Sequence, residues 1–219
     1  MTAPVTTPDE ALQRLRDGNE AFLRDDPIRP VLDRASRLRL AAGQQPFAAY
    51  LSCSDSRVPP ELLFGRGLGE LFIVRNAGNT LDTAAMGSLE FAVSQLGVKL
   101  VVVMGHEGCG AVAAALSVVQ ENARFPGSIG KMIQPIIPAA LEAHACGGGL
   151  DAAVRQNVRR VVRELREEAS PTLLRPQAAG ALAVVGAFYA LGTGVVDFFD
   201  LPGPNASLNA SLNGDTGRR

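Results

Sequence analysis

The chain has 219 residues, of which 47% are hydrophobic and 20% are charged, and its formal net charge is -1 at pH 7. This composition is that of an ordinary globular protein, and the near-neutral charge gives no reason to expect nucleic acid or a membrane surface as a partner. The 3 cysteines are an odd number, which argues against a disulfide framework and favours a reducing cytoplasm. The N-terminus has neither the basic nor the apolar region of a secretory signal.

The first expected element is an amphipathic helix that begins after Thr7, a capping residue followed by a proline and two acidic residues. Pro27 and Pro30 end this pattern, and residues 34–40 predict a second short helix. Together they form an N-terminal helical arm over residues 1–42. Such an arm packs either on a partner subunit or on the protein's own core, and the pattern favours neither.

Three short apolar runs, at 47–52, 71–75 and 100–104, predict buried strands. A helical stripe between the last two runs ends at Gly97, a residue that often follows the last turn of a helix. Near-continuous apolar strands separated by helices are typical of a parallel sheet covered on both faces. The sequence therefore predicts an α/β fold with a central, mostly parallel sheet flanked by helices.

A long polar helix is expected over 151–169, with its arginines on a solvated face. Residues 178–196 are uncharged over about the length of a bilayer span, but their glycines and two β-rich halves around 192–194 predict a buried hairpin instead. At this length we expect a single α/β domain over 1–200. The Pro, Asn, Ser and Gly residues of 201–219 predict a disordered tail.

Soft metal ligands follow two of the predicted strands. Cys53 comes directly after the first strand, and His106 and Cys109 come after the third. The carboxyl ends of parallel strands meet at one edge of a sheet, where ligands bind. Two thiolates and one imidazole are a three-ligand set that a catalytic zinc uses, with a fourth position left open. The sequence therefore predicts a zinc pocket, although a lone cysteine is more often part of the core.

Asp55 and Arg57 stand beside the first ligand and point the same way if this segment is extended. An arginine fork would keep Asp55 ionised and oriented, so that it could accept a proton or hydrogen bond from metal-bound water. Asp55 could instead occupy the fourth metal position, which leaves a closed structural zinc as the competing interpretation. His144 and Cys146 have no partner motif and are expected to be structural or exposed.

Three motifs in order closely resemble those of the β-class carbonic anhydrases: Cys-Ser-Asp-Ser-Arg at 53–57, Arg-Asn-Ala-Gly-Asn at 75–79 and Gly-His-Glu-Gly-Cys-Gly at 105–110. The resemblance implies one Zn²⁺ per subunit and reversible hydration of CO₂ to bicarbonate and a proton. It implies an α/β sheet that forms tight homodimers, often homotetramers, with N-terminal helices that embrace the neighbour.

The resemblance also assigns residues. It implies Cys53, His106 and Cys109 as zinc ligands and Asp55 with Arg57 as the catalytic dyad. Further positions match residues that contact the substrate, line its pocket or follow the last ligand: Gln44, Phe72, Phe91 and Gly110.

Some members of this family are switched by bicarbonate, with the aspartate on zinc in the inactive state. Those members typically have tryptophan where this chain has Tyr50, together with an arginine at the position of Arg75. Tyr50 and Gln44 favour a site in which Asp55 stays off the metal. Arg75 would then bridge the dimer or brace the loop.

Two other functions fit the same ligands. A relative of this family hydrolyses carbon disulfide or carbonyl sulfide, and access to the pocket separates it from a carbonic anhydrase. A non-catalytic zinc-binding assembly protein is the second alternative. Asp55, Arg57 and Gln44 argue against it, since a structural metal needs none of them.

Overall fold

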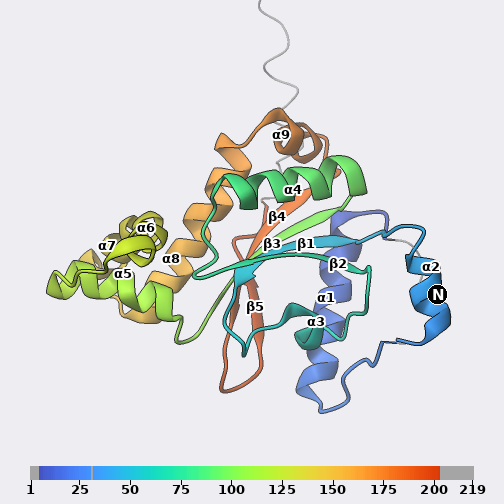
Figure 1. The fold of residues 1–219 in the computed structure, drawn as a ribbon, viewed down its shortest axis with the longest axis horizontal. Coiled ribbons are helices and arrows are strands. Elements are labelled where there is room, and N and C mark those ends of the chain that lie inside the picture. Colours follow the sequence, from blue (N-terminus) through green and yellow to red (C-terminus); the bar gives the residue numbers. More distant parts are fainter. Residues whose placement is uncertain (1–4, 31, 203–219) are drawn as a thin grey trace, which may run out of the picture.

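The computed structural model describes residues 5–30 and 32–202, which form one five-stranded sheet with helices on both sides (Figure 1). The strands lie in the order β2 (Leu71–Asn76), β1 (Ala48–Cys53), β3 (Leu100–His106), β4 (Ala183–Tyr189) and β5 (Val196–Phe199). The first four are parallel, and β5 runs antiparallel to β4. The predicted α/β fold with a mostly parallel sheet is confirmed.

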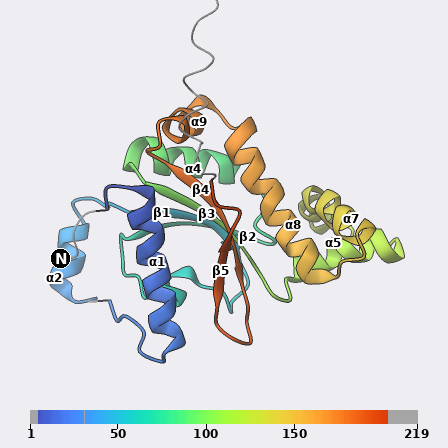
Figure 2. The same cartoon turned by 180° about the vertical axis from the view of Figure 1, so that it is seen from behind.

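Helices cover the two faces of the sheet differently (Figures 1 and 2). One side carries α4 (Thr83–Leu96), α8 (Leu150–Arg163) and α9 (Pro171–Ala178), and the other carries α1 (Pro8–Leu23) and α3 (Pro60–Leu63). A helical lobe projects from the end of the sheet where β3 stops, and α2 lies at the opposite end of the molecule. The lobe contains α5 (Gly110–Glu121), α6 (Gly127–Ile133), a 3₁₀ turn (Gln134–Ile136) and α7 (Ile137–Ala145), and α2 covers Arg34–Leu40.

The core strands extend slightly further than the apolar runs predicted. β1 continues to Cys53, which pairs with Asn76, and β3 continues to His106, which pairs with Tyr189. Hydrogen bonding between parallel strands therefore carries the regular structure into the two candidate ligands. Because each is the last residue of a strand, the sheet itself positions it.

The N-terminal helix begins as predicted. Thr7 accepts a hydrogen bond from the backbone N–H of Glu10 at 3.2 Å, and the Glu10 carboxylate accepts one from the Thr7 N–H at 3.2 Å. This reciprocal capping box satisfies two of the free N–H groups at the helix start. Ala11 and Leu15 are fully buried in the chain's own core, so α1 takes the second of the two packing modes expected for the arm.

Asn19 ties α1 to the hairpin between β4 and β5. Its amide donates to the carbonyl of Gly194 at 3.0 Å and accepts from the N–H of Val196 at 2.9 Å. The predicted hairpin is present, but it runs from β4 to β5 over residues 183–199, and residues 178–182 end α9 and lead into β4. Within the described ranges, no helix is long and apolar enough to cross a membrane.

The long polar helix is present as α8, continued by a π-helical turn (Glu164–Glu168) before Pro171. Its arginines do more than face solvent. Arg155 bonds Asp197 at 2.8 Å and lies 4.3 Å from the centre of the Phe188 ring. This arginine therefore joins the helix to the hairpin. Residues 203–219, most of the predicted tail, lie outside the described part of the chain.

Candidate metal centre

The three candidate ligands meet at the carboxyl edge of the sheet. One potential ligand atom from each of Cys53, His106 and Cys109 lies within 4.8 Å of the other two, and all three residues are buried. Cys53 ends β1, His106 ends β3, and Cys109 caps the start of α5. The structure thus brings together the ligand set expected from residues more than fifty positions apart.

The histidine is oriented to present one free nitrogen. Nδ1 of His106 lies 2.8 Å from the carbonyl oxygen of Glu107, and because a carbonyl only accepts, Nδ1 carries the proton. The lone pair of the neutral ring is then on Nε2. This atom is buried without a hydrogen-bond partner in the described part of the chain. An unpaired buried nitrogen is costly, and a bound metal ion would satisfy it.

The two sulfur atoms are 4.0 Å apart. The hydrogen bond from the Cys109 thiol lowers the pKa of Cys53 to about 4, and the N–H of Gly78 acts in the same direction against the opposing effect of burial. The same sulfur–sulfur bond raises the pKa of Cys109, since that thiol is the donor. One proton thus joins the pair, and a soft divalent ion that displaced it would bind both residues as thiolates.

Asp55 is held beside the ligands by a two-point ion pair. Oδ1 and Oδ2 accept from Nε and Nη2 of Arg57 at 2.9 and 2.7 Å, and Oδ1 also accepts from the Arg57 backbone N–H at 3.0 Å. These bonds lower the pKa of Asp55 well below its usual range. Its Oδ2 lies 4.0 Å from Nε2 of His106. Asp55 therefore stands next to the metal-ligand group while bound to Arg57.

The loop that carries Asp55 is braced from β2. Arg75 donates to the carbonyl of Cys53 at 2.9 Å and to the carbonyl of Asp55 at 2.6 Å. Of the two expected roles for Arg75, bracing the loop is the one these bonds support. Tyr50 is fully buried with its ring against Phe64, and burial raises the pKa of its hydroxyl.

The carbonic anhydrase family model matches residues 48–196, more than half of the chain. The chain belongs to the β-carbonic anhydrase family. Carbonic anhydrase 2 of Mycobacterium tuberculosis is 38% identical over 192 residues, which cover 87% of this chain and 92% of that protein. A carbonic anhydrase of Mycolicibacterium smegmatis is 37% identical over 195 residues, with coverage of 89% and 94%.

Solved structures agree with this assignment. The β-carbonic anhydrase CafA of Aspergillus fumigatus matches with a TM-score of 0.67 and 28% identity, covering 93% of this chain and 96% of that one. A structure from the work on two tetrameric β-carbonic anhydrases of Sordaria macrospora matches with a TM-score of 0.68 and 26% identity, with coverage of 87% and 94%. The family, the fold and the class of enzyme suggested by the three motifs are therefore confirmed.

The remaining residues implied by the family lie in different places. Gly110 is the first residue of α5 and adjoins the last ligand, whereas Gln44 is exposed in the loop before β1. The rings of Phe72 and Phe91 are 6.3 Å apart, and Phe72 packs with the apolar cluster beneath α4. Cys53 belongs to the cluster on the other side of the sheet. Roles in substrate binding for Gln44, Phe72, Phe91 and Gly110 stay predictions.

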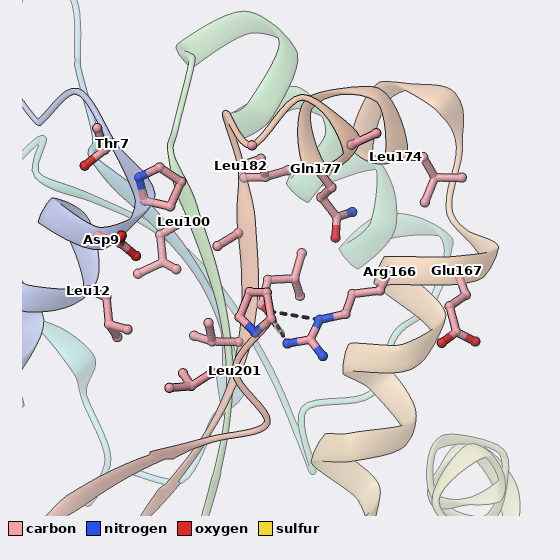
Figure 3. Close-up of a pocket in the computed structure, with 17 residues that line it drawn as sticks. Thr7, Asp9, Leu12, Leu100, Arg166, Glu167, Leu174, Gln177, Leu182 and Leu201 are labelled. Carbon is pink, nitrogen blue, oxygen red and sulfur yellow. Dashed lines mark hydrogen bonds between the residues drawn. The ribbon is translucent and has the colours of Figure 1, made fainter. Parts of the chain in front are cut away.

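A cavity of about 900 Å³ lies at the opposite edge of the sheet (Figure 3). Leu100 and Ala183, the first residues of β3 and β4, contribute to its wall, and Arg166 crosses one side while donating to the carbonyl of Val184. The candidate ligands stand at the carboxyl ends of β1 and β3 or just beyond, at the other end of the sheet. The cavity is therefore separate from the metal centre.

Sequence reasoning missed the backbone groups that hold the ligands. Glu107 was part of a recognised motif, but its contribution is a carbonyl oxygen, which any residue offers. The N–H of Gly78, 3.4 Å from Sγ of Cys53, was hidden for the same reason. His144 and Cys146 behave as expected: His144 contacts Gln120, and Cys146 is exposed where α7 ends.

Proposed function

We propose that this protein is a zinc-dependent carbonic anhydrase that catalyses reversible hydration of CO₂ to bicarbonate and a proton. The observation that carries the proposal is the convergence of Cys53, His106 and Cys109 at one sheet edge with a carboxylate 4.0 Å from the imidazole. Two cysteines and one histidine suit zinc best among the common ions and leave one coordination position open. When bound, the ion supplies a water molecule acidified toward neutral pH.

The chain's own residues prepare this position. Glu107 holds the His106 ring so that Nε2 faces the thiolates, and Arg75 holds the loop on which Asp55 stands. Arg57 then directs the Asp55 carboxylate. A carboxylate whose pKa is held this low is a weak base at neutral pH, so Asp55 acts by accepting a hydrogen bond that orients the reacting oxygen. A group other than Asp55 must therefore carry the proton of the reaction to solvent.

The ion pair also supports an open metal centre. A turn of Asp55 onto the metal would disturb both of its bonds to the Arg57 side chain. A bidentate charge-assisted pair is among the stronger side-chain contacts. We therefore propose that Asp55 stays on Arg57 and off the metal in the active state.

We further propose that the protein works as a homodimer or homotetramer in the cytoplasm, with CO₂ and bicarbonate as its substrate and product. The tetrameric relatives of Sordaria macrospora support assembly. Two thiol ligands support a reducing compartment, where they remain free to bind metal. Neither nucleic acid nor a membrane is an expected partner.

The test is stopped-flow CO₂ hydration by the zinc-loaded protein at pH 8.5, with carbon disulfide turnover measured beside it. We expect rapid hydration of CO₂ and negligible carbon disulfide turnover. The reverse ratio would assign the sulfide hydrolase activity. Absence of both in fully loaded protein would leave the non-catalytic assembly role.

A further inference from the structure

We propose that Asn157 is a positioning residue for the metal centre, because it holds the carbonyl of Gly78, the residue whose N–H donates to Cys53. This inference rests on the proposed zinc site. Asn157 lies on α8, distant in sequence from every candidate ligand, and it is only 2% exposed. A polar side chain this deeply buried is stable only where its amide finds partners.

The partner is Gly78. Nδ2 of Asn157 donates to the carbonyl oxygen of Gly78 at 3.0 Å, and the N–H of Gly78 lies 3.4 Å from Sγ of Cys53. The two bonds use the two peptide groups that flank a single Cα atom. A displacement of Gly78 moves both groups together, and the amide of Asn157 resists that displacement.

Packing and backbone conformation together require glycine at position 78. Gly78 has a φ of +76°, and a Cβ atom there would lie 2.6 Å from Cδ1 of Ile136 and 3.0 Å from Cβ of Ala111. These two residues confine Gly78 on the side of the helical lobe. Glycine lacks the side chain that would otherwise favour one backbone conformation, so an outside contact must fix the orientation of its peptides. Asn157 supplies that contact.

Close packing of α8 on the sheet places Asn157 within hydrogen-bond distance of Gly78. A Cβ atom at Gly105 of β3 would lie 2.5 Å from Cγ1 of Val154 and 2.9 Å from Cγ2 of Val158. Because Gly105 has none, the turn of α8 that carries Asn157 lies directly on the end of β3. The ligand-bearing strand thereby sets the distance between α8 and the Gly78 loop.

An N–H bond to a thiolate withdraws electron density from sulfur. Such contacts around metal ligands change the electrophilicity of the metal and the affinity for it. By holding the Gly78 N–H on Cys53, Asn157 limits electron donation from this thiolate and preorganises the site. Asn157 is not among the candidate ligands, so it acts only through Gly78.

The experiment compares Asn157→Leu and Asn157→Ala with Val162→Ala in the otherwise native, metal-loaded protein. Both Asn157 variants remove the donor, leucine with the same number of side-chain heavy atoms and alanine by truncation. Val162 is a fully buried residue of the same helix that packs on the far side of the sheet from Cys53, so its truncation controls for lost packing. Three readouts are independent of turnover: hydrogen exchange at the Gly78 amide, the thiolate-to-cobalt charge-transfer band of the Co²⁺ form, and the zinc dissociation constant.

In both Asn157 variants we expect faster exchange at Gly78, a charge-transfer band moved to longer wavelength, and zinc bound about tenfold more weakly. Val162→Ala should change none of these. If the band and the Gly78 exchange rate match the wild type in whichever Asn157 variant folds, the positioning role is wrong. That result with an active wild-type enzyme would leave the proposed function intact, whereas a wild type that bound no zinc would remove both proposals.

Discussion

Side chains at the proposed metal centre are each held by a second group. A carbonyl fixes His106, an arginine fork fixes Asp55, and a backbone N–H contacts Cys53. Contacts of this kind orient a ligand before the metal binds, so less conformational freedom is lost on binding. The metal site therefore consists of the ligands and of the groups that orient them.

Replacing Asp55 with asparagine keeps the shape of the side chain and removes its charge. We expect CO₂ hydration to slow by about 10²-fold, because the reacting oxygen loses the charged acceptor that orients it. Zinc content should remain close to that of the wild type, because Asp55 is bound to Arg57 and not to the ligand group. Stopped-flow rates and metal analysis of the same sample test this; parallel losses of activity and zinc would make Asp55 an obligatory ligand.

Removing the Arg57 guanidinium should raise the pKa of Asp55. Arg57 holds the pKa of this carboxyl below its ordinary value, so Arg57→Gln should raise it toward about 3.9. Because the pKa of Asp55 is lower in the folded protein, the ion pair stabilises the fold at pH values above the pKa of the unfolded state. This stabilisation is lost as the pH falls through the pKa of the folded state. Carboxyl carbon shifts followed by NMR during an acid titration would show the change. An Asp55 pKa that stayed low in the variant would contradict the role given to Arg57.

Elements are spaced by glycine where the chain packs most closely. α8 lies against β3 and β4 because Gly105 and Gly186 have no side chains where Val154 and Val158 meet the sheet. This helix carries Asn157, so its distance from the sheet also controls the Gly78 loop. Spacing of the elements and geometry of the site are thus coupled.

Gly105→Ala tests this spacing. The added methyl would overlap Val154 and Val158, and overpacking of this kind costs about 1–3 kcal/mol in the free energy of unfolding. Gly87→Ala is the matched control. Gly87 lies within α4, and an added Cβ would meet nothing within 4 Å, so alanine should stabilise the protein by up to about 1 kcal/mol. Urea unfolding of both variants gives the comparison, and equal effects would show that α8 has room to move.

Some elements were predictable and others were not. The strands, the cap at Thr7 and the end of α4 at Gly97 follow from apolar runs and from local hydrogen bonding. The α5–α7 lobe left no comparable pattern, because its sequence is rich in alanine and glycine. The role of Arg155 was missed because its partners come from β4 and β5, which are distant in the chain.

For the molecule as a whole, the site joins strands that are far apart in sequence but adjacent in the sheet. The core on either side of the sheet is continuous and apolar, and the ligands occupy only one of its edges. A sheet buried on both faces supplies enough apolar contact for folding without a metal. The metal should therefore serve chemistry more than stability.

Cys53→Ser tests this balance. We expect the variant to lose zinc and CO₂ hydration while keeping a cooperative unfolding transition and the oligomeric state of the wild type. If zinc binds only the folded protein, losing it lowers the free energy of unfolding by about 4 kcal/mol when zinc is present at 1,000 times its dissociation constant. Calorimetry and light scattering measure these properties. A variant that failed to fold would show that the metal is chiefly structural.

The sequence by itself determined the ligand chemistry and its neighbourhood: soft ligands after buried strands, and an aspartate and arginine two residues apart. These are local properties, because strand ends, caps and alternation of side chains depend on near neighbours. Only the tertiary structure decided that the Asp55–Arg57 pair lies beside the imidazole, that Arg75 braces the loop, and that Asn157 reaches Gly78 beside Cys53. The contacts of Arg75 and Asn157 cross between elements, and the burial that strengthens them exists only after the elements have packed.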